Sequence, residues 1–217
     1  MVYYIYMERT VISVRYLIAA LLAYLIGCSN MALYLSRLKK VNFRDKGSGN
    51  LGASNATLLL GWKAGVLVAL HDAGKAFLAV LLCRWLFPGL EYVGAVGGIA
   101  SVLGHIYPFY LKFKGGKGFA SYIGMTFALH WKLALAILIA AALITVITDY
   151  IVFGTLTTII SVPTYLGITY HSLILALILL VGTMVIVIKH RENFVRIAKK
   201  TEPGLRCAIS GKERVNK

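Results

Sequence analysis

Charged residues are scarce in this sequence, and acidic ones above all. Asp, Glu, Lys and Arg make up 14% of the chain, whereas an ordinary soluble domain contains about 25%. Only 8 residues are Asp or Glu against 23 that are Lys or Arg, which leaves a net charge of +15. Such a composition excludes intrinsic disorder and a water-soluble enzyme. It is typical of an integral membrane protein whose basic residues mark one side of the bilayer, and no nucleic-acid partner is expected.

Cysteine is also rare, and several motifs of known chemistry are missing. Cys28, Cys83 and Cys207 form no CxxC or Cys/His spacing, so we expect no structural disulfide and no metal site. A Walker A loop and a Ser-His-Asp order are absent as well, and no unit of about 20–50 residues repeats. We therefore expect no cofactor and a single membrane domain over residues 1–200, followed by a basic cytoplasmic tail over residues 201–217.

Long apolar runs are what the sequence has in abundance, since 59% of its residues are hydrophobic. A helix needs about 20 apolar residues to span a membrane. Five runs reach this length, at about residues 11–35, 58–86, 92–111, 150–170 and 172–189. Residues 118–148 form either one kinked span or two short arms that turn at His130, Trp131 and Lys132.

The basic residues decide between these two possibilities. Seventeen of the 23 lie in residues 37–46, in residues 112–117 or in the tail from residue 189. These segments share one side of the bilayer, as the positive-inside rule favours, only if residues 118–148 cross it twice. We therefore predict an all-α integral membrane protein of seven transmembrane helices, with its N-terminus outside and its C-terminus in the cytoplasm.

Three polar stretches interrupt the apolar sequence. The first, GSGNLGASN at residues 47–55, combines glycines with Ser and Asn side chains. Glycine allows successive backbone N–H groups to turn toward an anion, and the side chains add neutral donors. The stretch is therefore a candidate phosphate-binding loop, and the alternative is a flexible turn before a helix.

The second stretch, GHIYPFYLKFKGGKG at residues 104–118, carries three lysines and three glycines within its last seven residues. Clustered Gly and Lys favour an anion site, although an ordinary positive-inside loop would also carry lysines.

In the third stretch, KHRENFVR at residues 189–196, His190 and Asn193 are three positions apart and so share one face of a helix. The alternative there is a basic collar at the membrane surface. All three stretches fall on the predicted cytoplasmic side.

An ionisable pair lies inside the second apolar run. Asp72 and Lys75 are three positions apart and can pair on one face of a helix. Charged groups within a membrane are costly unless they pair or face a polar cavity. We expect a structural ion pair that supports the loops.

In this order and at these distances, the three stretches resemble those of the bacterial acyl-phosphate:glycerol-3-phosphate acyltransferases, the PlsY family, and Asp72 and Lys75 match its D-x-x-K pattern. The resemblance covers nearly the whole chain. It implies a multi-pass enzyme of the bacterial plasma (inner) membrane with its active site on the cytoplasmic side. The implied substrates are acyl phosphate and glycerol 3-phosphate, whose 1-hydroxyl is acylated to give lysophosphatidate and phosphate in the first step of phospholipid synthesis.

The resemblance also implies roles for individual residues. His190, Asn193 and Lys117 match catalytic positions. His190 is the candidate to orient or deprotonate the hydroxyl, and a substrate phosphate could equally take the proton. The residues implied to bind substrate or phosphate are Ser48, Gly49, Asn50, Asn55, His105, Lys114, Gly115, Gly116 and Gly118.

One departure from the family concerns phosphate binding. Leu58 stands where the family has an arginine, which would be expected to grip a substrate phosphate with two hydrogen bonds. Lys63 or Arg196 could supply the missing charge. The smaller departures are Asn30 for Pro, Ala76 for Gly and Asp149 for a basic residue.

Two other functions remain open from the sequence. An organic-anion transporter also uses glycine-interrupted helices at an anion site, but it should carry matching interruptions in two halves of the chain. The second alternative is a catalytically inactive relative that binds a lipid precursor, which the missing arginine at Leu58 would suit.

Overall fold

The computed structural model describes residues 2–210, with side chains from residue 10 to residue 207. Every regular element in that range is helical, as the sequence predicts. The longer helices are α1 (Val2–Cys28), α4 (Trp62–Leu86), α5 (Val93–Ile106), α7 (Trp131–Thr148), α8 (Ile151–Thr169) and α9 (Leu173–Ala198). The shorter ones are α2 (Met31–Leu38), α3 (Ala53–Leu60), the 3-10 turn η1 (Phe109–Leu111), α6 (Phe119–Leu129) and α10 (Leu205–Ser210).

Six helical segments of the described chain are long and apolar enough to cross a membrane, and α7 is one of them. The predicted turn at His130 is confirmed: α6 ends there, and Nδ1 of His130 accepts the N–H of Leu133 at 3.1 Å to cap α7. Residues 118–148 are therefore two arms and not one kinked span. The 11 residues of α6 rise about 16 Å at about 1.5 Å per residue, which is short of the hydrocarbon core.

The first predicted span is broken near its end. The helix stops at Cys28, and the Asn30 side chain caps the first turn of α2. The carbonyl groups freed by the break accept hydrogen bonds from side chains. The Tyr110 hydroxyl donates to the carbonyl of Cys28 at 2.7 Å, and the Lys75 ammonium group donates to the carbonyl of Ser29 at 2.5 Å. A break within an apolar run is tolerated here because these donors replace the lost helical hydrogen bonds.

The second predicted span is also shorter than the sequence indicates. The chain turns at Gly61, whose φ of 84° lies in the left-handed region that favours glycine. Leu58 therefore belongs to the short helix α3, and the membrane span proper is α4.

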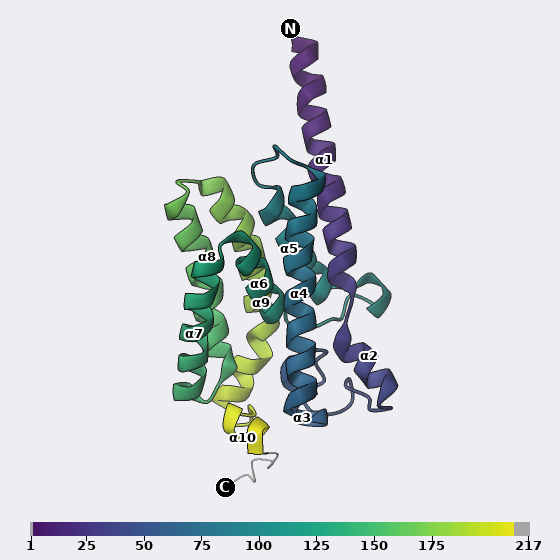
Figure 1. Ribbon diagram of the computed structural model, residues 1–217. Helices are drawn as coiled ribbons and strands as arrows, with labels where there is room; N and C mark the ends of the chain where they lie inside the picture. The colour runs from purple at the N-terminus through teal and green to yellow at the C-terminus, as the bar shows by residue number, and fades with distance from the viewer. Residues whose placement is uncertain (1, 211–217) are drawn as a thin grey trace.

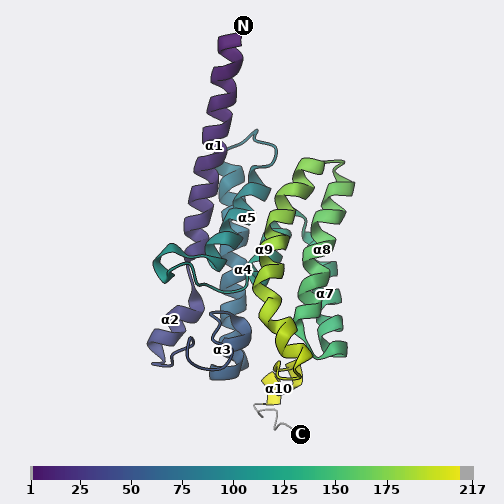
Figure 2. The ribbon, with the colours of Figure 1, turned by 180° about the vertical axis from the view of Figure 1, so that it is seen from behind.

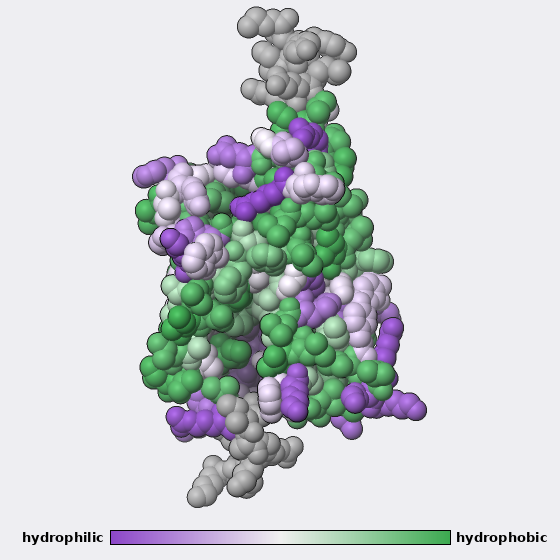
Figure 3. All heavy atoms as spheres, in the orientation of Figure 1, coloured by the Kyte–Doolittle hydropathy of each residue, from purple (hydrophilic) through white to green (hydrophobic). Residues whose placement is uncertain are grey.

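The long helices pack side by side in one bundle. α1 packs on α5 and α4, α4 also packs on α6, and α8 packs on both α7 and α9. Figures 1 and 2 show α1 reaching beyond the other helices at the N-terminal end, whereas α2, α3 and α10 gather at the opposite end. Apolar side chains cover much of the face seen in Figure 3, and hydrophilic ones gather toward its two ends, as expected for a membrane protein.

The chain beyond α9 turns back onto the bundle. The backbone N–H groups of Leu205 and Arg206 donate to the carbonyl and carboxylate oxygens of Asp149 at 2.8 and 2.9 Å. α10 packs on α3, and the Glu202 side chain is buried. Residues 201–210 therefore belong to the folded body, and the rest of the predicted tail, residues 211–217, lies outside the described residues.

Candidate active site

A cavity of about 300 Å³ opens where the three polar stretches meet. Its lining comes from the loops that precede α3 and α6 and from the C-terminal part of α9. The lining residues are Arg44, Ser48, Gly49, Asn50, Tyr107, Lys114, Gly115, Gly116, Lys117, Ile188, Lys189, Arg191 and Glu192. Stretches that are far apart in sequence are thus brought to one place, as the charge distribution predicts.

The first stretch forms a tight loop that presents Ser48 and Asn50 to the cavity. Its shape depends on Asn55, whose Oδ1 accepts the N–H of Ser48 at 2.8 Å and whose Nδ2 donates to the carbonyl groups of Phe43 and Lys46. The Asn55 amide is fully buried and does not line the cavity. The hydrogen-bonding groups of Asn55 therefore hold the loop together, and its contact with substrate stays a prediction.

The glycines of the second stretch hold the loop against α5. The N–H of Gly115 donates to the carbonyl of Ile106 at 2.9 Å, and that of Gly116 to the carbonyl of His105 at 3.1 Å. These two N–H groups are occupied by carbonyl groups of α5. Both glycines line the cavity, and their binding of phosphate stays a prediction. A side chain at Gly116 would collide with the His105 ring, so glycine here permits a close approach of the loop to the helix.

The lysines of the same stretch supply the positive charge. Lys114 and Lys117 both line the cavity, and the carbonyl of Lys114 accepts a hydrogen bond from Nη2 of Arg44. Burial lowers the pKa of Lys117 to about 8, and the neighbouring Arg196 acts in the same direction. Gly118 does not line the cavity; with a φ of 92°, it turns the chain into the first residue of α6.

The third stretch places His190 and Asn193 on one buried face of α9, as their spacing predicts, and each side chain is 4% exposed. Nδ1 of His190 donates to the carbonyl of Ile186 at 2.8 Å, so Nε2 is the acceptor atom of the neutral ring. Oδ1 of Asn193 accepts from Nζ of Lys117 at 2.5 Å. The lysine therefore connects the second stretch to the third.

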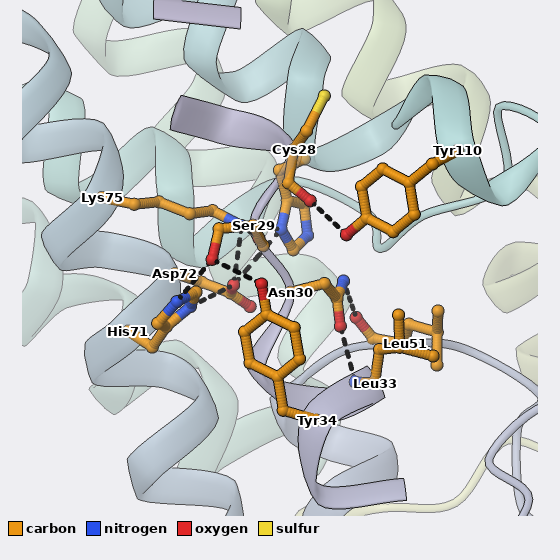
Figure 4. A network of polar contacts seen from close by, with 11 residues as sticks. Cys28, Ser29, Asn30, Leu33, Tyr34, Leu51, His71, Asp72, Lys75 and Tyr110 are labelled. Carbon is orange, nitrogen blue, oxygen red and sulfur yellow. Dashed lines mark hydrogen bonds and ion pairs between the residues drawn. The ribbon is translucent and has the colours of Figure 1, made fainter. Parts of the chain in front are cut away.

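The ion pair between Asp72 and Lys75 is present, with Nζ and Oδ1 2.9 Å apart (Figure 4). Lys75 also reaches Nδ1 of His105, again at 2.9 Å. His71 extends the network through Nε2 to the Ser29 hydroxyl at 3.0 Å. The network joins the break between α1 and α2 to α4 and α5. His105, expected to bind phosphate, belongs to this network and does not line the cavity.

Comparison with known proteins agrees with this geometry. Residues 17–200 match the family model described as glycerol-3-phosphate acyltransferase. The chain belongs to this family. It is 40% identical to glycerol-3-phosphate acyltransferase 1 of Oceanobacillus iheyensis, over 88% of this chain and 95% of that protein. With the glycerol-3-phosphate acyltransferase of Aquifex aeolicus the identity is 36%, over 83% of this chain and 94% of that protein.

Solved structures of the same family share the fold. The crystal structure of PlsY, an integral membrane glycerol 3-phosphate acyltransferase in its glycerol 3-phosphate form, matches with a TM-score of 0.81 and 34% identity, over 88% of this chain and 95% of that one. The lysophosphatidic acid form matches with a TM-score of 0.76 and 33% identity, over 87% and 94%. The cavity is therefore described below as that of a glycerol-3-phosphate acyltransferase.

The sequence predicts that Lys63 or Arg196 supplies the cation that Leu58 cannot. Of the two expected substitutes, Lys63 is exposed and lies over the ring of its neighbour Trp62, and Nε of Arg196 pairs with Glu202 at 2.5 Å. Neither belongs to the described residues that line the cavity, whereas Arg44 does. Sequence reasoning counted Arg44 only as one basic residue of a loop, although its position just before the GSGN motif was a usable signal.

Proposed function

We propose that this protein transfers a fatty acyl group from acyl phosphate to the 1-hydroxyl of glycerol 3-phosphate, giving lysophosphatidate and inorganic phosphate in the first step of phospholipid synthesis. The observation that carries the proposal is the cavity in which all three polar stretches converge, in a chain that belongs to the glycerol-3-phosphate acyltransferase family. It is lined by one acidic side chain, Glu192, and by the cations Arg44, Lys114, Lys117, Lys189 and Arg191. Such a charge suits two phosphorylated substrates.

The donor is already activated, so direct attack by the glycerol hydroxyl suffices. Acyl phosphate is a mixed anhydride, and phosphate leaves as the new ester forms. No described cysteine lines the cavity, and Cys28 and Cys83 are buried elsewhere. Alignment of two bound substrates contributes about 7 to 11 kcal/mol to lowering such a barrier, and fixed positive charge contributes further.

The roles of individual residues follow from their atoms. Lys117, near the end of the second stretch, contacts Asn193 of α9 and lines the cavity. It is placed to hold a phosphate or the negative charge that develops during the reaction. His190 is buried between the cavity residues Lys189 and Arg191 and does not itself line the cavity; its Nε2 is the candidate acceptor for the hydroxyl proton. A substrate phosphate is the other acceptor, and Ser48 and Asn50 add neutral donors.

Seven crossings with the N-terminus outside form part of the proposal, since the two arms that meet at His130 bring the basic segments to one side. The cavity then faces the cytoplasm from the bacterial inner membrane. Residues 1–200 form one membrane domain, and the basic cytoplasmic tail from residue 201 begins with the segment that folds back onto it. The transporter alternative gains no support, because the polar stretches gather at one end of the bundle.

One assay tests this function. Purified protein in detergent is given acyl phosphate and glycerol 3-phosphate, and lysophosphatidate and inorganic phosphate are measured together. Equal amounts of the two products are expected, with none from acyl-CoA. Lys117→Met should abolish most of the product, whereas Lys132→Met, a change at an exposed lysine, should not. Phosphate released without lysophosphatidate would show a different acceptor, and equal rates with acyl-CoA would overturn the donor assignment.

A further inference from the structure

Glu202 lies beyond the end of α9 and nevertheless reaches the candidate catalytic residues. The chain reverses at Lys200, which has a φ of 57°, and the N–H groups of Thr201 and Glu202 both donate to the carbonyl of Arg196. This turn buries Glu202, which is 8% exposed. Its Oε1 accepts from Nδ2 of Asn193 at 2.5 Å, and its Oε2 accepts from Nε of Arg196 at 2.5 Å.

The amide of Asn193 is held between two partners of opposite character. The ammonium group of Lys117 can only donate hydrogen bonds, so it must meet Oδ1 of Asn193. An ionised carboxylate can only accept, so Glu202 must meet Nδ2. A flipped amide would place donor against donor at Lys117 and acceptor against acceptor at Glu202. Glu202 therefore fixes the orientation of the Asn193 amide, with Oδ1 toward Lys117.

The charge of Glu202 matters as well as its hydrogen bonds. Arg196 disfavours the protonated form of Lys117, and Glu202 favours it. Since Glu202 also pairs with Arg196, its loss would leave the guanidinium beside Lys117 with only the longer contact to Glu192, at 3.9 Å. The titratable groups that face Lys117 or share its cavity are Arg44, Tyr107, Lys114, Lys189, His190, Arg191, Glu192, Arg196 and Glu202.

We propose that Glu202 is a positioning residue of the acyl-transfer site: through Asn193 and Arg196 it orients Lys117 and keeps it charged. This inference rests on the proposed function. Glu202 is not among the described residues that line the cavity. The folded-back segment that carries it is anchored independently by the bonds from Leu205 and Arg206 to Asp149.

Glu202→Gln is the sharpest test. Glutamine has a single side-chain oxygen, which the charged donor Arg196 would take. Its NH2 group would then face Asn193, whose amide would turn and present its own NH2 group to Lys117. In this variant the pKa of Lys117 should be lower than in the wild type, so a larger fraction of the lysine is neutral at pH 8. We therefore expect kcat/KM to fall at least tenfold at pH 8 and to recover partly at lower pH, where the lysine is protonated again. Glu202→Asp keeps the carboxylate and should restore the wild-type pH profile.

A second measurement reads Lys117 without relying on catalysis. The rate of its acetylation by acetic anhydride is followed against pH by peptide mass spectrometry, which gives its apparent pKa in each variant. This pKa should be lower in Glu202→Gln than in the wild type and in Glu202→Asp. Glu91→Gln is the matched control, because Glu91 is exposed in the loop before α5 and should change neither measurement.

The outcomes separate the two proposals. Suppose that the wild type makes no lysophosphatidate but the pKa of Lys117 is lower in Glu202→Gln than in the wild type. This result would overturn the proposed function, and the effect of Glu202 on Lys117 would still hold. An unchanged pH profile and an unchanged Lys117 titration in Glu202→Gln would overturn the positioning role. Should Glu202→Gln fail to fold in detergent, Glu202→Asp decides, since a profile displaced from that of the wild type would contradict the proposal.

Discussion

Nζ of Lys75 lies 2.9 Å from Nδ1 of His105, in the interior of a bundle that is otherwise largely apolar. Because an ammonium group only donates, Nδ1 accepts and the ring proton of the neutral histidine is on Nε2. The His105 ring packs on Gly116, and its backbone carbonyl holds the Gly116 N–H. The ion pair of α4 thus supports the loop that carries Lys117, which is the structural role expected from its spacing.

Removing one member of this pair should be more harmful than removing both. Lys75→Met leaves the Asp72 carboxylate buried without its ammonium partner, which costs about 3 to 5 kcal/mol in comparable cases. Asp72→Asn combined with Lys75→Met should recover part of that loss. Thermal unfolding in detergent provides the measurement. Lys63→Met, at an exposed lysine of the same helix, is the control, and a Lys75→Met protein as stable as this control would contradict the role.

His190→Ala and Asn193→Ala should each lower turnover at least tenfold, which corresponds to about 1.4 kcal/mol in the activation barrier. The first removes the acceptor Nε2, and the second removes the amide that meets Lys117. Steady-state kinetics provides the measurement, with the melting profile as a check on folding. If both variants fold and retain wild-type turnover, the third stretch has no catalytic role and is only a basic segment at the membrane surface.

Much of this site was predictable from sequence, and the remainder depends on hydrogen bonds that no spacing reveals. The charge distribution predicted that three distant stretches lie together, and residues of all three line one cavity. Helical spacing predicted the pair of Asp72 and Lys75. Asn55 and Gly116 were expected to meet substrate, but their polar groups are used within the protein. Glu202 gave no signal, because its contact with Asn193 depends on a chain reversal at Lys200.

The activity should fall as the pH rises through about 8. Burial lowers the pKa of Lys117 to about 8, so the cavity loses one positive charge above that pH. Phosphate monoesters have a second pKa of about 6 and do not change charge in this range. KM for the phosphorylated substrates should therefore rise between pH 7.5 and 9.5. A bound phosphate favours the ammonium form, so kcat should fall less than kcat/KM, and a flat kcat/KM profile would contradict the role of Lys117.

The sidedness of the membrane can be tested with Cys207. This residue lies in α10, beyond α9, while Cys28 and Cys83 are buried. A membrane-impermeant thiol reagent should label Cys207 in inverted vesicles but not in intact spheroplasts, because the positive-inside rule places this end in the cytoplasm. Cys207→Ser supplies the blank. Labelling from outside would overturn seven crossings and place the cavity on the other side of the membrane.

We expect Arg44, which lines the cavity, to hold the acceptor phosphate where Leu58 cannot. Arg44→Ala should raise KM for glycerol 3-phosphate, because a charged hydrogen bond contributes about 1.5 to 3 kcal/mol and each 1.4 kcal/mol is about tenfold in affinity. Leu58→Arg introduces the arginine expected from the family resemblance and should lower KM for glycerol 3-phosphate. The decrease should be larger in the Arg44→Ala variant than in the wild type, because Arg44 of the wild type already lines the cavity. Arg37→Ala, at an exposed arginine of α2, should leave KM unchanged. If acyl phosphate is consumed and none of these changes alters the dependence on glycerol 3-phosphate, the acceptor is another alcohol.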